Sequence, residues 1–355
     1  MILKSRNVKK IILSFDYNKI LKSNLYKYYS EGKKIVFIID KVLKNNKIVN
    51  HIKNDIKGSF FFISIKQEIT TDFVDKLKFK ILNKTYPDII IAIGGGSTLD
   101  AGKAISVLIT NKKKAEYYQG WDLLKNKGIY SIGIPSLSGT GAESSKTCVL
   151  LNKKKNLKLG FNSKYTCFDE VYLLPELLKK INKKLLFITA TDTYFHSFEL
   201  LNGMKRSKHA DKLATKSLNL IKDFLISKDL KHNINLKKLM LSSFYAGEAI
   251  SFGMVGLVHP FSAALSTIYG IPHCISNCIV FRGLNNYYEK EYLFFLKCQN
   301  KQNIRISRLK RKISLKVNLL YKSLMRHQKP LINALGRDFI KKLDYKTVNN
   351  IFDKI

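Results

Sequence analysis

The stretch Asp88-Ile-Ile-Ile-Ala-Ile-Gly-Gly-Gly-Ser-Thr-Leu-Asp-Ala-Gly-Lys103 decides how the first half of this 355-residue chain is expected to fold. Its apolar run is typical of a buried strand, and the residues at 97–110 predict a helix. Contiguous glycines let a backbone approach a phosphate without a Cβ in the way, and a helix N-terminus offers N–H groups to a pyrophosphate. A tight strand-to-helix turn is the alternative explanation. The predicted phosphate-binding residues are Gly94, Gly95, Gly96 and Ser97.

The pattern around this stretch predicts two domains of different class. Strands are expected at 9–14, 33–39, 58–65, 88–93 and 129–134, with a further helix at 71–82. Strands that alternate with helices predict an α/β domain over residues 1–175, with a parallel, Rossmann-like sheet covered by helices on both faces. The second half contains long amphipathic stretches, which predict an all-helical domain over residues 176–355. These stretches are 176–181, 190–201, 210–226 and 236–250.

Two further segments are suited to a dinucleotide. Ile134-Pro-Ser-Leu-Ser-Gly-Thr-Gly-Ala-Glu143 follows a predicted strand, and its hydroxyls could bond phosphate, ribose or the nicotinamide amide. The candidates in it are Ser136, Ser138 and Thr140. Asp40 ends another strand, where a carboxylate can accept hydrogen bonds from the adenosine ribose. Such a carboxylate would repel a 2′-phosphate, so we expect NAD rather than NADP, although Asp40 could also be a plain turn residue.

Four residues of the second half have the side chains of a divalent-metal site. Asp192 and His196 are four apart, which on a helix places both on one face. His259 and His273 lie in a largely apolar stretch, where an unsatisfied imidazole costs about 1–3 kcal/mol. Three nitrogens and one carboxylate suit Zn²⁺ or Fe²⁺ better than Mg²⁺ or Ca²⁺. Each histidine alone could instead be an ordinary core histidine. The other histidines are expected to be dispensable: His51, His209, His232 and His327.

Composition argues against several other classes of protein. The net charge of +37 could attract nucleic acid, but the lysines are spread through the chain without an Arg-rich arm, a zinc finger or an aromatic-basic motif. No segment reaches the roughly 18 uninterrupted apolar residues of a membrane span, and the N-terminal residues are not typical of a secretory signal. Five cysteines without a CxxC pair fit a reduced cytoplasm. Cys274 follows His273, and its side chain is expected to point away from the face that presents His273.

Taken together, these motifs resemble the iron-containing (group III) alcohol dehydrogenase family, whose architecture is similar to that of dehydroquinate synthase. The pieces that carry the resemblance are Gly94–Asp100 with Lys103, then Pro135–Glu143, Asp192 with His196, and 259–273. Within the family the chain looks most like the branch that oxidises 3-deoxy-D-manno-octulosonate (Kdo) at C8. The segments that suggest this branch are 118–126, 157–163, 277–281 and 345–355.

The resemblance implies roles for particular residues. Asp192, His196, His259 and His273 would bind one Fe²⁺ or Zn²⁺. Lys158 would approach the nicotinamide ribose and Asp100 would lie near the nicotinamide and substrate, so both are catalytic candidates. The resemblance also implies a homo-oligomer, expected to be a dimer.

One position departs from the family pattern. Many members have another histidine four positions after the first of the pair, and here that position is Ala263. An alternative alignment would make His259 this extra histidine and leave Val255 at the ligand position. The spacing of His259 and His273 fits the ligand pair without a gap, so His259 is preferred as the ligand. A substrate hydroxyl, a cofactor ribose hydroxyl or ordered water would then relay the proton.

The expected reaction is oxidation of a primary alcohol by hydride transfer to the nicotinamide, which gives an aldehyde. In the Kdo interpretation that aldehyde is aminated to an 8-amino sugar for lipopolysaccharide. The alternatives are a dehydrogenase of small alcohols or polyols and, less favoured by Asp192 and His196, a sugar-phosphate cyclase of the dehydroquinate synthase type. The sugar hypothesis rests on Gln119-Gly-Trp-Asp122, in which Trp121 would face the sugar and Gln119 and Asp122 would bond its hydroxyls. Trp121 could equally be a packing anchor.

Overall fold

The computed structural model describes residues 2–64, 68–309 and 316–355, and its fold consists of two compact units. The first unit contains the residues up to Lys153 together with Lys158–Ile181. The second contains Lys154–Leu157 and Asn182–Ile355. The units therefore divide after Ile181, whereas the sequence pattern places the boundary after residue 175.

The first unit is built on a seven-stranded sheet in the order β1-β2-β10-β7-β5-β3-β4. All neighbouring strands are parallel except β1, which pairs antiparallel with β2. The parallel sheet predicted from the sequence is thus confirmed. The strands are β1 (Ile2–Leu3), β2 (Lys10–Leu13), β3 (Ile35–Asp40), β4 (Ser59–Ile63), β5 (Ile89–Gly94), β7 (Tyr130–Pro135) and β10 (Glu170–Leu173).

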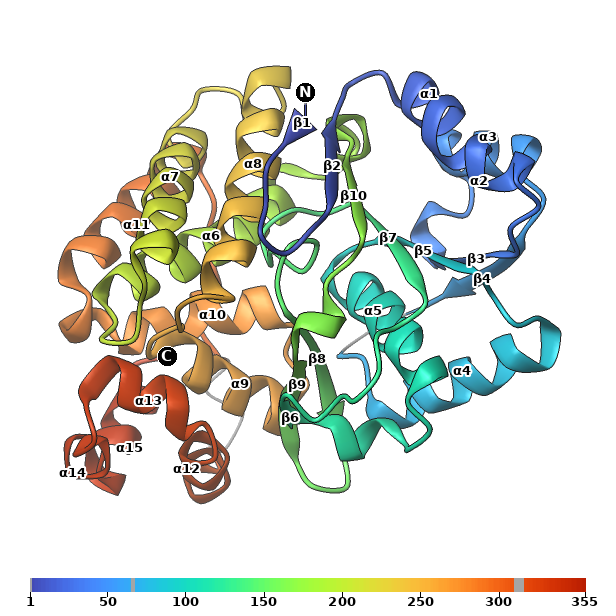
Figure 1. The fold of residues 1–355 in the computed structure, drawn as a ribbon. Helices are drawn as coiled ribbons and strands as arrows, with labels where there is room; N and C mark the ends of the chain where they lie inside the picture. The colour runs from blue at the N-terminus through green and yellow to red at the C-terminus, as the bar shows by residue number, and fades with distance from the viewer. Residues whose placement is uncertain (1, 65–67, 310–315) are drawn as a thin grey trace. The chain divides into compact units, whose positions relative to one another are not determined.

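Helices cover both faces of this sheet because the side chains of a strand alternate between faces. Phe37 and Ile39 of β3 pack with the helical segment that begins at Tyr17 and with α3. Val36 and Ile38 of the same strand point to the other face and pack with α4 and α5. Figure 1 shows helices on both faces of the sheet. The helices are α1 (Tyr17–Ile20), a π-helical turn (Leu21–Leu25), α2 (Tyr26–Ser30), α3 (Lys47–Asp55), α4 (Thr71–Lys84) and α5 (Gly96–Thr110).

A second, three-stranded sheet in this unit was not expected from the sequence. It consists of β6 (Gly120–Trp121), β9 (Leu157–Asn162) and β8 (Thr147–Asn152), in the order β6-β9-β8. β8 contains the apolar run Cys148–Leu151, and β9 alternates apolar and polar residues, so both carry strand patterns that the prediction left out. β6 has only two residues and carries no pattern. Lys158 and the Trp121 segment both lie in this sheet.

The second unit is helical, as predicted. Its longest helix, α6 (Lys183–Asn202), is buried from Leu186 to Leu200 and packs against α7, α8 and α10. The other helices are α7 (Lys208–Leu225), α8 (Asn233–Ile250), α9 (Val258–Tyr269), α10 (His273–Gly283), α11 (Glu289–Gln302), α12 (Val317–Met325), α13 (Gln328–Leu335), α14 (Phe339–Lys342) and α15 (Tyr345–Asp353). The prediction that 176–181 belongs to the helical domain was wrong. These residues lie in the first unit, where the 3₁₀ turn Pro175–Leu178 covers part of the stretch.

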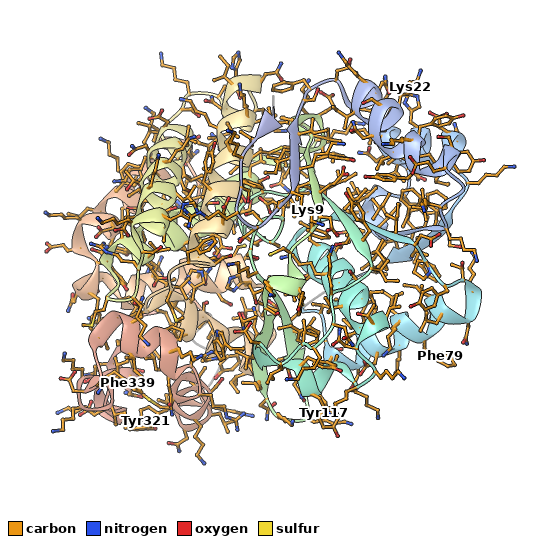
Figure 2. All side chains as sticks on the ribbon, viewed as in Figure 1. Lys9, Lys22, Phe79, Tyr117, Tyr321 and Phe339 are labelled. Carbon is orange, nitrogen blue, oxygen red and sulfur yellow. The ribbon has the colours of Figure 1, made fainter. Side chains whose placement is uncertain are left out.

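The surface agrees with the dispersed positive charge seen in the sequence. Figure 2 shows nitrogen-tipped side chains projecting from helices of both units, Lys22 among them. Within the described residues no helix is both long and apolar enough to cross a membrane.

Candidate functional site

The four predicted metal ligands come from three helices of the second unit. Asp192 and His196 lie one turn apart on α6, and both are buried. α9 ends at Tyr269, and the left-handed backbone of the next residue, Gly270 (φ 67°), turns the chain. α10 begins three residues after Gly270, at His273. Since α9 and α10 also pack together, His259 in the first turn of one helix and His273 at the start of the other both reach α6.

The four side chains meet at one oxygen of Asp192. The distance from Asp192 Oδ1 is 3.4 Å to His259 Nε2, 3.7 Å to His273 Nε2 and 4.0 Å to His196 Nε2. The rings of His196 and His259 stack, with their centroids 4.4 Å apart. The prediction that these residues lie close together therefore agrees with the geometry, although the side chain of His273 is 26% exposed and not buried as expected.

The donor atoms fit a small divalent cation. One ligand atom from each of Asp192, His196 and His259 lies within 4.8 Å of the other two. Zn²⁺ binds nitrogen and oxygen at about 2.0–2.2 Å, which in a tetrahedron separates neighbouring ligand atoms by roughly 3.4 Å. The separations between Asp192 Oδ1 and Nε2 of His259 and His196, 3.4 and 4.0 Å, are close to this value. His273 lies outside the compact set of three but is within reach of Asp192.

The pKa values of Asp192 and His259 are set by two opposing influences, burial and the neighbouring charged groups. Burial alone would raise the pKa of Asp192, but His196, His273 and His259 together hold that pKa well below its ordinary value. Burial would lower the pKa of His259, and the carboxylates of Glu199 and Asp192 outweigh it and raise the pKa to about 9. Asp192 is therefore ionised at neutral pH, as a metal ligand must be.

Two residues of α10 also contact Asp192. The role of Asn277 was not predicted from the sequence, and the direction of the Cys274 side chain was predicted wrongly. Asn277 Nδ2 donates to Asp192 Oδ1 at 2.6 Å, and Cys274 Sγ donates to Oδ2 at 3.6 Å. The expectation that Cys274 points away from the site was wrong, because residues at the start of α10 converge on the buried carboxylate. Asn277 was detectable in principle, since it lies one helical turn after His273.

The geometry also bears on the two alignments of the histidine pair. His259, and not Val255, places a ligand atom beside Asp192. Ala263, one turn later on α9, is buried. The position at which many family members have another histidine therefore holds only a methyl group here.

The predicted phosphate loop joins β5 to α5 in the first unit. Gly94 ends the strand, Gly95 is the N-cap, and α5 begins at Gly96. A Cβ on Gly94 would lie 2.5 Å from Thr98 Cβ, and one on Gly96 would lie 2.8 Å from Thr140 Oγ1. Two of the three glycines are therefore required by packing within the chain itself.

The second hydroxyl-bearing segment lies directly against this loop. Ser136 N–H donates to the carbonyl of Gly94 at 2.8 Å, which continues the pairing of β5 with β7. Ser136 and Ser138 are buried, and among the described residues Ser138 Oγ has no hydrogen-bond partner. A buried hydroxyl of this kind beside a helix N-terminus fits a bound phosphate or amide group.

Asp40 lies at the same edge of the sheet. It ends β3, which pairs with β5 in register from Ile35 to Ile39, so Asp40 lies beside the glycine loop. Its Oδ1 accepts the N–H of Val42 at 3.1 Å and caps a 3₁₀ turn. Asp40 therefore acts as a turn residue. This bond uses Oδ1, so it does not by itself exclude a hydrogen bond from a ribose hydroxyl to Oδ2.

Asp100 and Lys158 belong to a partly buried group of charged side chains near α5 and the three-stranded sheet. Lys158 Nζ forms an ion pair with Glu68 Oε1 at 2.9 Å. Asp100 Oδ2 accepts the N–H of Val149 at 3.0 Å. Burial raises the pKa of Asp100 to about 7, although Lys103 opposes this shift. An acid with this pKa can take up or release a proton near neutrality.

The segment expected to bind a sugar is only partly available for binding. Gln119 Nε2 donates to the carbonyls of Leu150 and Leu159, so it bridges β8 and β9. The expectation that Gln119 could bond substrate hydroxyls was wrong for this reason. Trp121 is 41% exposed, which does not fit a buried packing anchor.

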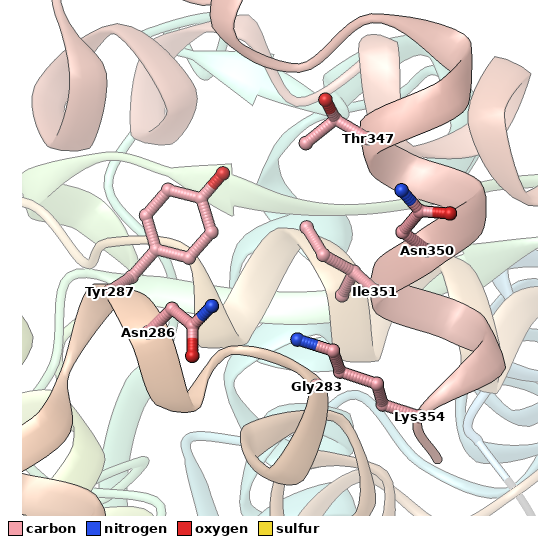
Figure 3. A pocket seen from close by; sticks show the side chains of 7 residues that line it. All are labelled: Gly283, Asn286, Tyr287, Thr347, Asn350, Ile351 and Lys354. Atoms are coloured by element: carbon pink, nitrogen blue, oxygen red, sulfur yellow. The ribbon is translucent and has the colours of Figure 1, made fainter.

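A separate hollow of about 280 Å³ lies in the second unit between the end of α10 and α15. Figure 3 shows its mixed polar and apolar lining, with Lys354 and Asn286 facing each other across it. None of its lining residues is a predicted ligand, and it contains no histidine or carboxylate.

Comparison with known proteins identifies the family. The sequence model described as iron-containing alcohol dehydrogenase matches residues 19–175, and that of the family's C-terminal domain matches residues 187–348. This chain belongs to the iron-containing alcohol dehydrogenase family. The two matches together span most of both units.

Similar sequences and structures agree with membership of this family. The chain is 31% identical to a sulfoacetaldehyde reductase of Bilophila wadsworthia, over 56% of this chain and 53% of the relative. It is 29% identical to a 4-hydroxybutyrate dehydrogenase of Clostridium kluyveri, over 57% and 55%. These matches thus span about half the length of each relative. A crystal structure of an iron-containing alcohol dehydrogenase aligns with 99% of this chain and 98% of that chain, at 21% identity and a TM-score of 0.81.

Proposed function

We propose that this protein is a metal-dependent oxidoreductase that interconverts a primary alcohol and an aldehyde with a nicotinamide cofactor. The observation that carries the proposal is the convergence of one buried carboxylate and three imidazoles from α6, α9 and α10. Most buried polar side chains are satisfied by backbone groups or by one partner. Here a buried carboxylate and three imidazoles, one of them buried and two partly buried, face one another in a chain of a metal-dependent dehydrogenase family.

In this proposal Asp192, His196, His259 and His273 hold one Fe²⁺ or Zn²⁺. When bound, such a cation supplies Lewis-acid chemistry that favours ionisation of an alcohol near neutral pH. The chain's own residues fix the ligands in place. Asn277 and Cys274 orient the two oxygens of Asp192, and the buried flanks of α6 keep water away from the carboxylate.

The proposed cofactor is NAD, with NADP as the second candidate. The loop Gly94–Ser97 with Ser136, Ser138 and Thr140 would bind the pyrophosphate and nicotinamide side, and Asp40 the adenosine ribose. When bound, the cofactor would supply the nicotinamide ring as the hydride acceptor or donor. Lys158 would approach its ribose, with its ammonium oriented by Glu68. Asp100 would lie near the nicotinamide and the substrate.

The proposed substrate is a small molecule with a primary alcohol and an acidic group. Kdo, oxidised at C8 for an 8-amino sugar of lipopolysaccharide, is the specific candidate from the sequence resemblance. The names of two relatives, sulfoacetaldehyde reductase and 4-hydroxybutyrate dehydrogenase, favour smaller acids as the second candidate. The internal hydrogen bonds of Gln119 remove one contact on which the Kdo hypothesis relied.

A substrate screen tests the proposal. The protein is stripped of metal, reloaded with Fe²⁺ or Zn²⁺, and assayed by NADH absorbance with Kdo, 4-hydroxybutyrate and 1,3-propanediol, and with sulfoacetaldehyde in the reverse direction. Metal-dependent turnover of at least one compound supports the oxidoreductase proposal. A kcat/KM for Kdo at least tenfold above the others supports the Kdo assignment. No metal-dependent turnover of any of them contradicts the proposed substrate class.

We further propose a cytoplasmic homodimer. All five cysteines lie in the described part of the chain and none forms a disulfide, which favours a reducing compartment. Light scattering of the purified protein tests the dimer, and a mass near 41 kDa, that of one chain, would contradict it.

A further inference from the structure

Glu199 lies on the same face of α6 as Asp192 and His196. The three residues follow at intervals of four and three, which places them on successive turns of one helix face. Glu199 is fully buried. A buried carboxylate costs several kcal/mol unless it is paired, so its partners indicate what it does.

Both oxygens of Glu199 are used by the first turn of α9. Oε1 accepts the N–H of Val258 at 2.5 Å, and Oε2 contacts Nδ1 of His259 at 2.5 Å. The N-cap residue of α9, Leu257, supplies no side-chain cap. Glu199 therefore caps α9 from a different helix, and the same carboxylate holds the ring of His259.

The residues just before His259 are held by Glu199 of α6 and by Tyr288, the N-cap residue of α11. Tyr288 Oη accepts the N–H of Leu257 at 3.1 Å. A Cβ on Gly256 would lie 2.5 Å from Tyr288 Oη and 3.0 Å from Glu199 Oε1. The segment 256–259 thus fits closely against Glu199 and Tyr288, which leaves the ring of His259 little freedom to move away.

The contact at Nδ1 determines which nitrogen can bind a cation. A carboxylate only accepts hydrogen bonds, so Nδ1 must carry the hydrogen in this contact. The other nitrogen, Nε2, faces Asp192 Oδ1 at 3.4 Å. A carboxylate behind a histidine is a recurrent way to orient a metal ligand and raise its basicity.

We propose that Glu199 is a positioning residue that acts through His259 and directs Nε2 of His259 toward Asp192 and His196. This inference rests on the proposed metal site. Glu199 does not itself contact the cation; it selects the nitrogen of His259 that does.

The isosteric variant Glu199→Gln tests the inference. Val258 N–H and His259 Nδ1–H are both donors, and a glutamine has one acceptor oxygen and one NH₂ group. Either the amide donates to Nδ1 and leaves the hydrogen on Nε2, or two donors face each other. We expect the dissociation constant for Zn²⁺, measured by competition with a chromophoric chelator, to rise 10- to 100-fold.

Glu248→Gln is the matched control. Glu248 is a fully buried glutamate of α8 in the same unit, and its Oε1 lies 3.5 Å from Nε2 of His209, which is not a predicted ligand. This variant loses the same charge beside a histidine. Its Zn²⁺ affinity is expected to stay within twofold of wild type. An equal loss of affinity in both variants would overturn the positioning role.

A double-mutant cycle separates positioning from general damage. If Glu199 acts through His259, Glu199→Gln changes the weaker Zn²⁺ affinity of His259→Ala by less than twofold. A full further loss in that background would overturn the inference. If wild type itself binds no Zn²⁺, the proposed metal site fails; if wild type binds and Glu199→Gln binds equally well, only the present inference fails.

A measurement on the wild-type chain covers the case in which Glu199→Gln does not fold. Nitrogen-15 NMR of histidine-labelled, Zn²⁺-loaded protein is expected to show a strongly downfield, slowly exchanging Nδ1–H that disappears in His259→Ala. Absence of that signal in wild type would contradict the inference.

Discussion

The two predicted ligand sites differ in how far packing alone explains their residues. In the glycine loop, Gly94 and Gly96 are required because Thr98 and Thr140 occupy the space of a Cβ. In the metal cluster, packing gives no comparable reason for Asp192 and three histidines to converge. A glycine motif can thus be structural and functional at once, whereas converging ligand atoms indicate function more directly.

The largest effect is expected from His259→Ala. It removes the imidazole nearest to Asp192 Oδ1, so metal content should fall from about one ion per chain to near zero and activity should be lost. His273→Ala should cause a smaller loss, because His273 lies outside the compact set of three. Elemental analysis by mass spectrometry checks both. His209→Ala is the control. A normal metal content in His259→Ala would show that this cluster does not bind the metal.

The next effects are expected from two substitutions in the glycine loop. They separate the packing role of one glycine from the cofactor-binding role of another. Gly94→Ala is expected to lower the free energy of unfolding by about 1–3 kcal/mol, because its Cβ would meet Thr98 at 2.5 Å. In Gly95→Val the added Cβ meets only the Leu137 side chain, 3.2 Å from its Cδ1. This variant should leave stability within about 1 kcal/mol of wild type while NAD affinity, measured by calorimetry, falls at least tenfold. Unchanged NAD affinity would leave the loop a purely structural turn.

Asp100 gives a pH-dependent effect of moderate size. Its pKa is raised from 3.8 to about 7 by burial. Between these values the folded chain keeps a proton that the unfolded chain releases, so the contribution of Asp100 to stability falls as pH rises to about 7 and is level above it.

The variant Asp100→Asn should remove this slope and still accept the N–H of Val149. At pH 8 its free energy of unfolding should exceed that of wild type by roughly 2–4 kcal/mol, and the difference should shrink toward pH 4. Urea denaturation across this range is the measurement. A difference that does not depend on pH would contradict the raised pKa.

The smallest effect is expected from Asp40→Ala. Loss of the cap on Val42 N–H should cost about 0.5–2 kcal/mol of stability, and loss of the carboxylate should narrow the preference for NAD over NADP. The ratio of kcat/KM for the two cofactors is the readout, with Asp40→Asn as the variant that keeps the cap. An unchanged ratio in both variants would make Asp40 only a turn residue.

Features that depend on nearby residues were predictable from the sequence. The glycine loop, the strand before it and the spacing of Asp192 and His196 are local, and all three occur where the sequence placed them. The three-stranded sheet was missed although β8 and β9 carry strand patterns, and its third strand, β6, is too short to carry one. The position of Asn277 on the same face of α10 as His273 follows from the spacing, but the contact of Cys274 with Asp192 depends on how α10 packs against α6. Glu199 was detectable, since it continues the face of Asp192 and His196.

Anomalous X-ray scattering from crystals of Zn²⁺-loaded protein, recorded on either side of the zinc absorption edge, would locate the bound metal relative to Asp192 and the three histidines. We predict a single strong peak per chain within about 2.0–2.2 Å of Asp192 Oδ1 and of Nε2 of His196 and His259, with His273 completing the coordination. A peak bound by other residues, or no peak beside Asp192, would contradict the account.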